Sequence, residues 1–314
     1  MLGAVPGYAQ IAAAEQRVAL VIGNDAYPNA PLRNPVNDAR AIAKTLNQLD
    51  FNVLLKTNLS QKGMIEALRE YSARLKEGDV ALFYYSGHAV QIKGRNFLIP
   101  VDADIRSEDE VPYLSLDVSQ VLDKLEYARS RTNIVILDAC RNNPFVRNFR
   151  STQAGLAQME APSGTLIAFA TAPGSVARDG DSDYGTYTRH LLTQMPIPGM
   201  PIEVMFRRVR ESVRAETANQ QTPWEQSSLT GDFFFRPASA KKPALAVPPA
   251  GSSPVPTPQA DPILELLKRA EKPVQAAPVP VPAPANIPRT DPIYDLLQRG
   301  EDPGSARPRE QVTK

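Results

Sequence analysis

The sequence predicts an α/β fold in which a mostly parallel, six-stranded sheet lies between helices, followed by a disordered, proline-rich tail. Apolar, strand-like segments alternate with amphipathic, helix-like segments between residues 17 and 236, and strands joined by helices form parallel sheets with helices on both faces. The composition changes near Pro237, because 17 of the 30 prolines lie in the last 78 residues. Proline removes backbone donors and favours extended chain, so we expect one globular domain at 17–236 and a disordered spacer at 237–314.

The strands and helices of the domain are predicted from the spacing of apolar residues. In the second helical stretch, for example, Ile65, Leu68 and Tyr71 recur at helical spacing, and Ser60 before them is a natural N-cap. The predicted strands are Arg17–Gly23, 51–56, 80–85, 133–138, 165–170 and 232–235. The predicted helices are 37–49, 61–76, 116–127 and 202–219.

Composition and charge exclude several classes of protein. The net charge is +1 and aromatic residues make up 7% of the chain, which is not the basic, aromatic-rich pattern of nucleic-acid binding. A single cysteine excludes an internal disulfide framework and a multi-cysteine metal site. No apolar run reaches the roughly 18 residues that a membrane span needs. No glycine-rich phosphate turn follows any strand, which argues against a nucleotide-binding protein.

Two segments outside the domain each allow two interpretations. Residues 1–16 begin like the end of a secretory signal, with Gly7-Tyr-Ala9 as a small-x-small cleavage site, although the basic start and most of the apolar core are missing. Export to the periplasm is favoured over a disordered cytosolic arm. In the tail, 261–271 recurs as 291–301, and each copy starts with Asp and Pro before a short amphipathic stretch. The repeat predicts docking motifs for a protein partner, or else duplicated linker.

A cysteine and a histidine follow two strands of the predicted sheet. Cys140 comes directly after the strand at 133–138, and His88 follows the strand at 80–85. A thiol attacks as thiolate, and since its ordinary pKa is about 8.5 it needs a base or a positive charge nearby. A buried cysteine alone is often a small core residue, but two strand ends of one parallel sheet lie where such sheets bind ligands. Cys140 and His88 are therefore the candidate catalytic pair. His190, in the short helix-like run 188–192, suits a surface or packing role.

The residues around this pair resemble the histidine and cysteine motifs of the caspase-like cysteine peptidases. The matching segments are 86–90, Ser-Gly-His-Ala-Val, and 138–145, Asp-Ala-Cys-Arg-Asn-Asn-Pro-Phe. The bacterial metacaspase-like (orthocaspase) branch is the most similar, because there too an Asp stands two residues before the cysteine. The resemblance covers residues 17–235 and implies a caspase-like sandwich. Further matching segments are 19–24, 34–39, 96–102, 168–185 and 221–225.

The resemblance implies hydrolysis of peptide bonds by a Cys–His dyad. His88 would take the proton of the Cys140 thiol and later protonate the leaving amine. Backbone N–H groups of Gly87, Ala89 and Cys140 would hold the oxyanion. Ala89 departs from the family, which usually has glycine there, and alanine tolerates a positive φ poorly. If this position needs such a φ, the alternative is a catalytically silent caspase-like module that binds partners through its tail.

The resemblance also implies a pocket for the side chain that precedes the cut. In metacaspase-like enzymes this pocket is acidic and accepts Arg or Lys, and the matching positions here are Asp38, Ser86 and Asp138. Two converging carboxylates repel each other unless a cation lies between them, so a basic substrate residue is the natural partner. True caspases use Arg to accept Asp, and Arg33 lies close to that location. A preference for Asp is thus the alternative.

Two loops near this sheet edge carry further expectations. Asp179 and Asp181 follow the fifth predicted strand, where they could shape the pocket, bind calcium as an activator, as in some metacaspases, or lie in solvent. No cofactor is required and no other metal is expected. The segment 145–163 joins the cysteine strand to the next one, and in this family such a linker is often cleaved by the enzyme itself. The candidate positions of self-cleavage are Arg147 and Arg150.

Overall fold

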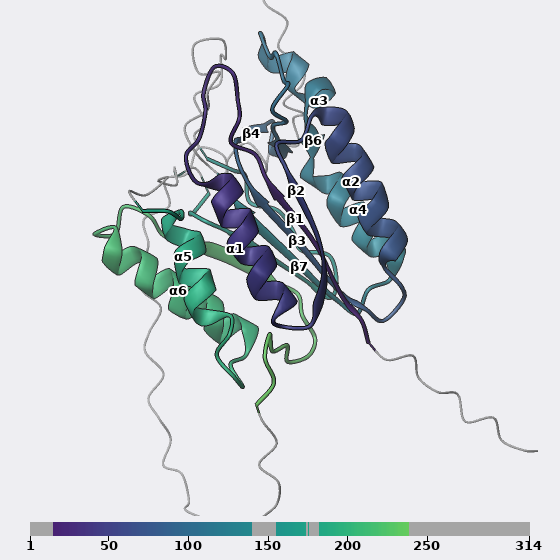
Figure 1. Ribbon diagram of the computed structural model, residues 1–314, viewed down its shortest axis with the longest axis vertical. Helices are drawn as coiled ribbons and strands as arrows, with labels where there is room; N and C mark the ends of the chain where they lie inside the picture. Colours follow the sequence, from purple (N-terminus) through teal and green to yellow (C-terminus); the bar gives the residue numbers. More distant parts are fainter. Residues whose placement is uncertain (1–14, 140–154, 174, 176–181, 239–314) are drawn as a thin grey trace, which may run out of the picture. The chain divides into compact units, whose positions relative to one another are not determined.

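A computed structural model describes residues 15–139, 155–173, 175 and 182–238 of the chain. They contain a six-stranded sheet with the strand order β2-β1-β3-β7-β8-β9, in which only β9 runs antiparallel to its neighbour (Figure 1). The mostly parallel sheet expected from the sequence is confirmed. The strands are β1 (Arg17–Gly23), β2 (Phe51–Thr57), β3 (Val80–Ser86), β7 (Thr132–Asp138), β8 (Thr165–Phe169) and β9 (Trp224–Ser227).

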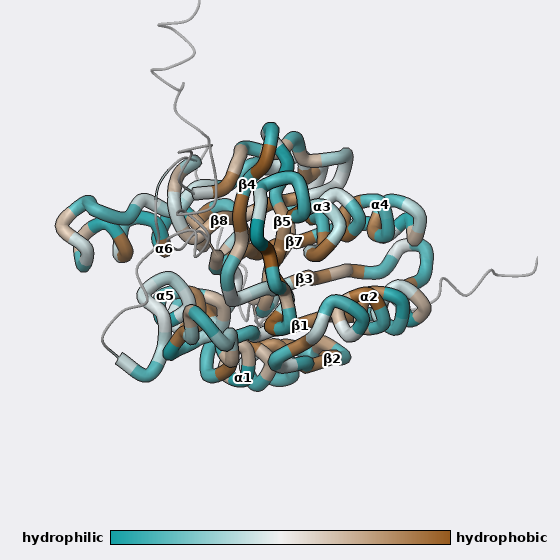
Figure 2. The backbone as a smooth tube through the Cα atoms, turned by 90° about the horizontal axis from the view of Figure 1, so that it is seen from above, coloured by the Kyte–Doolittle hydropathy of each residue, from teal (hydrophilic) through white to brown (hydrophobic). Residues whose placement is uncertain are grey.

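Helices cover both faces of this sheet. One face carries α1 (Pro35–Asn47), α5 (Thr186–Gln194) and α6 (Ile202–Glu216), and the other carries α2 (Gln61–Arg74) and α4 (Val118–Ala128) (Figures 1 and 2). Side-chain caps start α2 and α4. The Ser60 hydroxyl accepts a hydrogen bond from the backbone N–H of Gly63 at 3.1 Å, as expected for an N-cap, and the Asp117 carboxylate accepts from Ser119 N at 2.8 Å.

The centre of the sheet is buried on both faces. Every residue of β3 and β7 is buried, which explains why these two strands read as continuous apolar runs. The start of α1 packs closely against the end of β1, which requires glycine at position 23. A Cβ there would lie only 2.3 Å from the carbonyl oxygen of Pro35. The predicted strand and helix boundaries in this region agree with the structure to within a few residues.

A second, three-stranded antiparallel sheet follows β3, and the sequence analysis did not predict it. A two-residue turn joins its first two strands, with Lys93 at φ 50° and Gly94 at φ 78°, as in the hairpin turns that match the twist of β-strands. On one of its faces, Val90, Ile92 and Phe97 form a cluster with Tyr27, Ile99 and Ile105 that is separate from the main core. The sheet consists of β4 (Ala89–Ile92), β5 (Arg95–Leu98) and β6 (Leu116–Asp117), and η1 (Glu108–Glu110) and α3 (Val111–Leu114) lie between β5 and β6.

Two predicted elements are wrong in detail. The sixth strand is β9 and not residues 232–235, of which only Phe234 forms an isolated bridge, to Pro201. Phe233 and Phe235 are instead buried in the main core, where the Arg17 guanidinium donates to the carbonyl of Phe235 at 2.7 Å and lies 5.2 Å from the Phe233 ring. The helix predicted at 116–127 begins at Val118, because the two residues before it belong to β6.

Several predictions fall on residues outside the described part of the chain. These are the N-terminal segment through residue 14 and the tail from residue 239, which includes both copies of the repeat at 261–271 and 291–301. The disordered spacer, the docking motifs and the export signal therefore stay predictions. In the described ranges, no helix is both long enough and apolar enough to cross a bilayer.

Candidate active site

The strand ends that carry the two candidate catalytic motifs are direct neighbours. β3 and β7 pair in parallel with Ser86 opposite Asp138, and His88 and Cys140 each come two residues after this pair. Cys140 itself lies outside the described residues, which end here at the buried Ala139. Neighbouring strands lie about 4.8 Å apart, so the two motifs leave the same edge of the sheet side by side.

The ring of His88 is held in one tautomer. Its Nε2 atom lies 2.8 Å from the carbonyl oxygen of Ala30, in the loop between β1 and α1, and the side chain is only 4% exposed. A carbonyl oxygen can only accept, so Nε2 carries a proton and donates it. In the neutral ring, the lone pair that can take up a proton is consequently on Nδ1.

Two buried tyrosines hold the backbone of His88. The N–H of His88 donates to Tyr27 Oη at 3.0 Å, and Tyr85 Oη donates to the carbonyl of His88 at 2.8 Å. The same carbonyl accepts from Ile99 N at 3.0 Å, and the rings of Tyr27 and His88 lie 4.5 Å apart. Burial, followed by the effect of Tyr27, raises the pKa of Tyr85 well above its ordinary value, so its hydroxyl remains a donor.

The hydroxyl groups of Tyr27 and Tyr85 leave no room for a side chain at Gly87. They lie 3.2 Å apart directly against the turn. A Cβ built at Gly87 would come within 2.6 Å of Tyr85 Oη and 2.7 Å of Tyr27 Oη, closer than real Cβ contacts. Any larger residue here has to displace the tyrosines or the turn that carries His88.

Ala89 does not have the positive φ that would strain an alanine. It begins β4 opposite Leu98. Because Ile99 N donates to the carbonyl of His88, Ala89 and Leu98 form a non-hydrogen-bonded pair, and the N–H of Ala89 points away from β5. The neighbouring N–H of His88 is already used by Tyr27.

The three predicted pocket residues lie together beside this turn. Asp38, Ser86 and Asp138 are at most 3% exposed. The Asp38 carboxylate accepts from the backbone N–H of Gly185 at 2.9 Å and from the Ser86 hydroxyl at 3.4 Å, and the Thr188 hydroxyl donates to Asp138 at 2.7 Å. Both carboxylates are thus bound by the start of α5. Asp38 also lies in the first turn of α1, where the helix dipole favours a negative charge.

Arg33 is exposed on the loop before α1. Asp179, Asp181, Arg147 and Arg150 lie outside the described residues.

The described residues offer no calcium site. They contain no group of three His, Cys, Asp or Glu side chains that could hold a metal ion. The acidic residues around η1 are bound by their own chain: Asp104 pairs with Arg106 at 2.7 Å, and Glu110 accepts from Arg106 N at 2.8 Å. Asp102 accepts from Gln61 N at 2.9 Å and so caps the start of α2. Asp179 and Asp181, where calcium binding is predicted, lie outside the described residues, so calcium activation stays a prediction.

The returning end of the 145–163 linker is anchored to the second sheet. The side-chain amide of the buried Asn96 donates to the carbonyl of Ala157 at 2.8 Å and accepts from its N–H at 2.7 Å. Leu156 beside it is buried in the main core. The linker is therefore fixed on the C-terminal side of the two candidate arginines.

Comparison with known proteins identifies the family. A model of the caspase domain matches residues 16–234, which is most of the chain. The chain belongs to the caspase domain family. It therefore carries a caspase-like peptidase domain, and the resemblance drawn from the His88 and Cys140 motifs is confirmed at this level.

The alignments with individual relatives cover a little over half of this chain. The mucosa-associated lymphoid tissue lymphoma translocation protein 1 of Homo sapiens and its homologue in Mus musculus are 31% identical over 167 residues, 52% of this chain and 19% of theirs. A probable protease of a Desulfuromonadales bacterium is 26% identical over 212 residues, 56% of this chain and 25% of its own. The chain thus spans a quarter or less of the length of these relatives.

Sequence reasoning missed residues that hold the site, Tyr85 among them. The others lie on loops or at a helix start, far in sequence from the groups they bind: Tyr27, Ala30, Gly185 and Thr188. One signal was available: Tyr84 and Tyr85 end an otherwise apolar buried strand, and buried tyrosine hydroxyls need partners.

Proposed function

We propose that this protein is a cysteine endopeptidase that cleaves after Arg or Lys, with Cys140 as nucleophile and His88 as general base. The observation that carries the proposal is the register of β3 and β7, combined with the bond from His88 Nε2 to Ala30. The register starts both motifs side by side, and the bond leaves Nδ1 as the basic nitrogen. A caspase-like peptidase domain makes peptide or protein the substrate.

The chemistry follows from these atoms. His88 Nδ1 takes the proton of the Cys140 thiol, and the thiolate attacks the substrate carbonyl carbon. The N–H groups of Ala89 and Cys140, together with that of Gly87, are the proposed donors to the oxyanion. Collapse of this intermediate breaks the C–N bond, and the leaving amine takes the proton from Nδ1. A water molecule that loses its proton to Nδ1 then hydrolyses the thioester and frees Cys140.

The buried carboxylates support a preference for basic residues. Asp38 and Asp138 both border Ser86 on the side of α1 and α5. Two buried carboxylates at one site repel each other, and a guanidinium or ammonium group relieves this repulsion. A substrate Asp would add a third negative charge, so the alternative based on the exposed Arg33 is the weaker one.

Self-cleavage after Arg147 or Arg150 is part of the proposal. The anchor between Asn96 and Ala157 keeps the C-terminal side of the linker attached to the domain after a cut. Incubation of the purified chain should yield two fragments with a junction after one of these arginines, read by mass spectrometry. The Cys140→Ala chain should stay intact, and equal cleavage in both proteins would exclude self-processing.

A peptide assay tests the activity itself. A fluorogenic peptide that ends in Arg should be hydrolysed by the unaltered chain and not by Cys140→Ala or His88→Gln, and the matching Asp peptide should be a poor substrate. Assays with calcium and with a chelator test whether calcium activates the enzyme, which the residues Asp179 and Asp181 suggest. Absence of Cys140-dependent turnover in both conditions would instead favour the silent binding module, with the tail repeat as its docking element.

A further inference from the structure

A chain of hydroxyl groups leads from the sheet to the carboxylate of Asp138. Tyr84 Oη lies 2.6 Å from Thr188 Oγ1, which lies 2.7 Å from Asp138 Oδ2. All three residues are buried, and they come from three different elements, β3, α5 and β7. The distance from Tyr84 Oη to the same carboxylate oxygen is 3.5 Å, so Thr188 lies between them.

The direction of these hydrogen bonds is fixed by the acceptor. An ionised carboxylate can only accept, so the Thr188 proton goes to Asp138. The Thr188 oxygen can then accept, and Tyr84 donates to it. Burial and, after it, the negative charges of Asp138 and Asp38 raise the pKa of Tyr84 well above its ordinary value, so the tyrosine stays protonated.

We propose that Tyr84 and Thr188 are positioning residues for substrate selection: their hydroxyl chain orients the Asp138 carboxylate toward an Arg or Lys side chain. This inference rests on the proposed function, because it assigns the selection of the basic residue to the same pocket. Hydrogen bonds to a charged acceptor are stronger than those between neutral groups, and the bidentate pairing of Arg depends on the angle of the carboxylate. A wrongly turned carboxylate therefore weakens substrate binding and leaves the bond-breaking atoms untouched.

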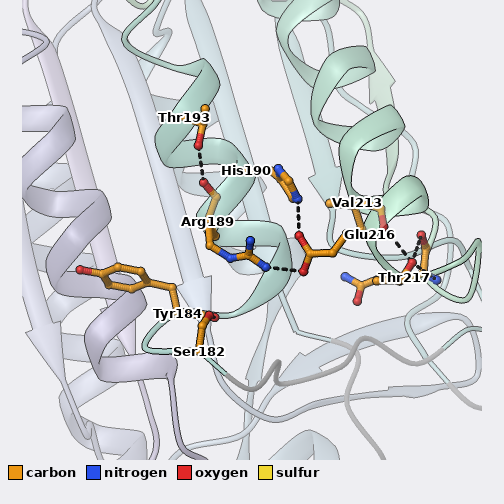
Figure 3. Close-up of polar contacts among 9 residues, drawn as sticks. Ser182, Tyr184, Arg189, His190, Thr193, Val213, Glu216 and Thr217 are labelled. Atoms are coloured by element: carbon orange, nitrogen blue, oxygen red, sulfur yellow. Dashed lines mark hydrogen bonds and ion pairs between the residues drawn. The ribbon is translucent and has the colours of Figure 1, made fainter.

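The opposite side of α5 carries a separate set of contacts. Figure 3 shows Arg189 and His190 of α5 directed toward Glu216 at the end of α6. Arg189 forms an ion pair with Glu216, and His190 Nε2 lies 2.9 Å from the second carboxylate oxygen. These contacts hold α5 against α6 without touching Asp138. Glu216→Gln is thus a matched control for a mere shift of α5.

Binding can be measured without turnover in the Cys140→Ala background. The probe is a peptide that ends in Arg, with the citrulline peptide of the same shape but no charge as reference, both followed by calorimetry. Thr188→Val keeps the side-chain volume and removes the hydroxyl, and we expect the Kd of the Arg peptide to rise about tenfold. Thr188→Ser restores the hydroxyl, so its Kd should stay within about threefold of the unaltered value.

Kinetics in the active protein separate positioning from a structural role. Thr188→Val should raise KM for the Arg peptide about tenfold while kcat stays within about twofold. Tyr84→Phe, which leaves the Thr188 bond to Asp138 in place, should raise KM about threefold. If Thr188→Val does not fold, Tyr84→Phe alone decides.

The outcomes distinguish this inference from the function on which it rests. An unchanged Kd in both hydroxyl variants, or an equal loss of binding in Glu216→Gln, overturns the role of Tyr84 and Thr188 while the peptidase proposal stands. Equal affinity of the unaltered chain for the Arg and citrulline peptides overturns the basic preference, and the inference with it.

Discussion

Two neighbouring tyrosines of β3 serve opposite sides of the sheet. Tyr85 donates to the carbonyl of His88 and lies against Tyr27, on the side of the second sheet. Tyr84 donates to Thr188 on α5, on the side of α1 and α6 (Figure 1). Successive side chains of a strand point to opposite faces of the sheet. Tyr85 therefore belongs to a histidine network, formed with Tyr27 and His88, and the preceding Tyr84 to a carboxylate network, formed with Thr188 and Asp138.

This difference separates rate from recognition. The face of Tyr85 holds the turn that carries His88, the proposed base, so we expect a change there to lower kcat. The face of Tyr84 holds the carboxylate of the proposed substrate pocket, so we expect a change there to raise KM. A tyrosine hydroxyl is buried on each face, so Tyr→Phe substitutions at Tyr84 and Tyr85 remove the same chemical group from the two networks.

The largest effect is expected at Gly87, where the histidine network meets the turn. In Gly87→Ala the new methyl group would lie 2.6 Å and 2.7 Å from the two tyrosine hydroxyls, so His88 has to move. A shift of about 1 Å in a reacting group lowers the rate about 100-fold, and we expect this loss in kcat. Steady-state kinetics with the Arg peptide measures it. Gly231→Ala is the control, because its methyl group meets nothing within 4 Å. A rise in KM alone would break the comparison.

A smaller effect is expected from removing one hydroxyl of the histidine network. Tyr85→Phe deletes the donor to the carbonyl of His88, which keeps its bond from Ile99 N. One hydrogen bond is worth about 1 kcal/mol, so kcat should fall roughly fivefold to tenfold with KM unchanged. Tyr84→Phe is the matched variant on the other face, with KM affected instead. The same kinetic signature in both variants would show that the two faces are coupled.

The sequence predicted the parallel strands well because burial dictates their composition. β1 and β7 contain continuous apolar runs, 18–22 and 134–137, since both faces of the sheet are covered. β9 was missed because an edge strand needs no such run: Trp224, which begins it, is 41% exposed and polar residues follow. The second sheet was missed because its strands are four residues or shorter, too short for a clear period.

The candidate site was predictable only as far as its motifs reach. Asp38, Ser86 and Asp138 could be placed together because the resemblance to metacaspase-like enzymes assigns matching positions to one pocket, and in the structure they do lie together. Tyr27 and Thr188 could not, since their contacts span 61 and 50 residues of sequence and depend on where a loop and a helix pack. The doubt about Ala89 arose from a backbone angle, which composition and spacing do not determine.

Alkaline pH offers a test that uses a tyrosine outside both networks. Burial raises the pKa of Tyr71 well above its ordinary value, as it does for Tyr84 and Tyr85, yet the Tyr71 hydroxyl has no hydrogen-bond partner in the described residues. Up to about pH 10, these hydroxyls are protonated in both the folded and the unfolded chain. Above it the unfolded chain releases protons that the folded chain keeps, so the free energy of unfolding falls by up to about 1.4 kcal/mol per pH unit per tyrosine.

Above pH 10, the free energy of unfolding of Tyr71→Phe should fall less steeply with pH, because one buried tyrosine no longer contributes. At pH 7 its free energy of unfolding should be unchanged or higher, because a buried hydroxyl without a partner is lost. Tyr84→Phe and Tyr85→Phe should be less stable than the unaltered chain at pH 7, since each loses a hydrogen bond. Urea unfolding at pH 7 and at several values above 10 measures both quantities. A loss of stability in Tyr71→Phe equal to that of Tyr85→Phe would remove the distinction between network and core tyrosines.

The smallest effect, a change in stability, is expected at Glu216, which binds α5 on the side away from Asp138. Partial burial raises the pKa of its carboxyl group, but hydrogen bonds and charges from Arg189 and His190 outweigh this, and the net pKa is lowered. The lowered pKa stabilises the fold above the ordinary Glu value of about 4.3, and this contribution is lost as the pH falls through the folded value. The side chain is 34% exposed, so solvent screening limits the effect to a few tenths of a kcal/mol. Thermal melts of Glu216→Gln should thus differ from the unaltered chain by about 1–2 °C at pH 7 and by less near pH 3. A large loss of stability together with a raised KM would mean that the position of α5, and not the hydroxyl groups of the Tyr84 face, sets the pocket.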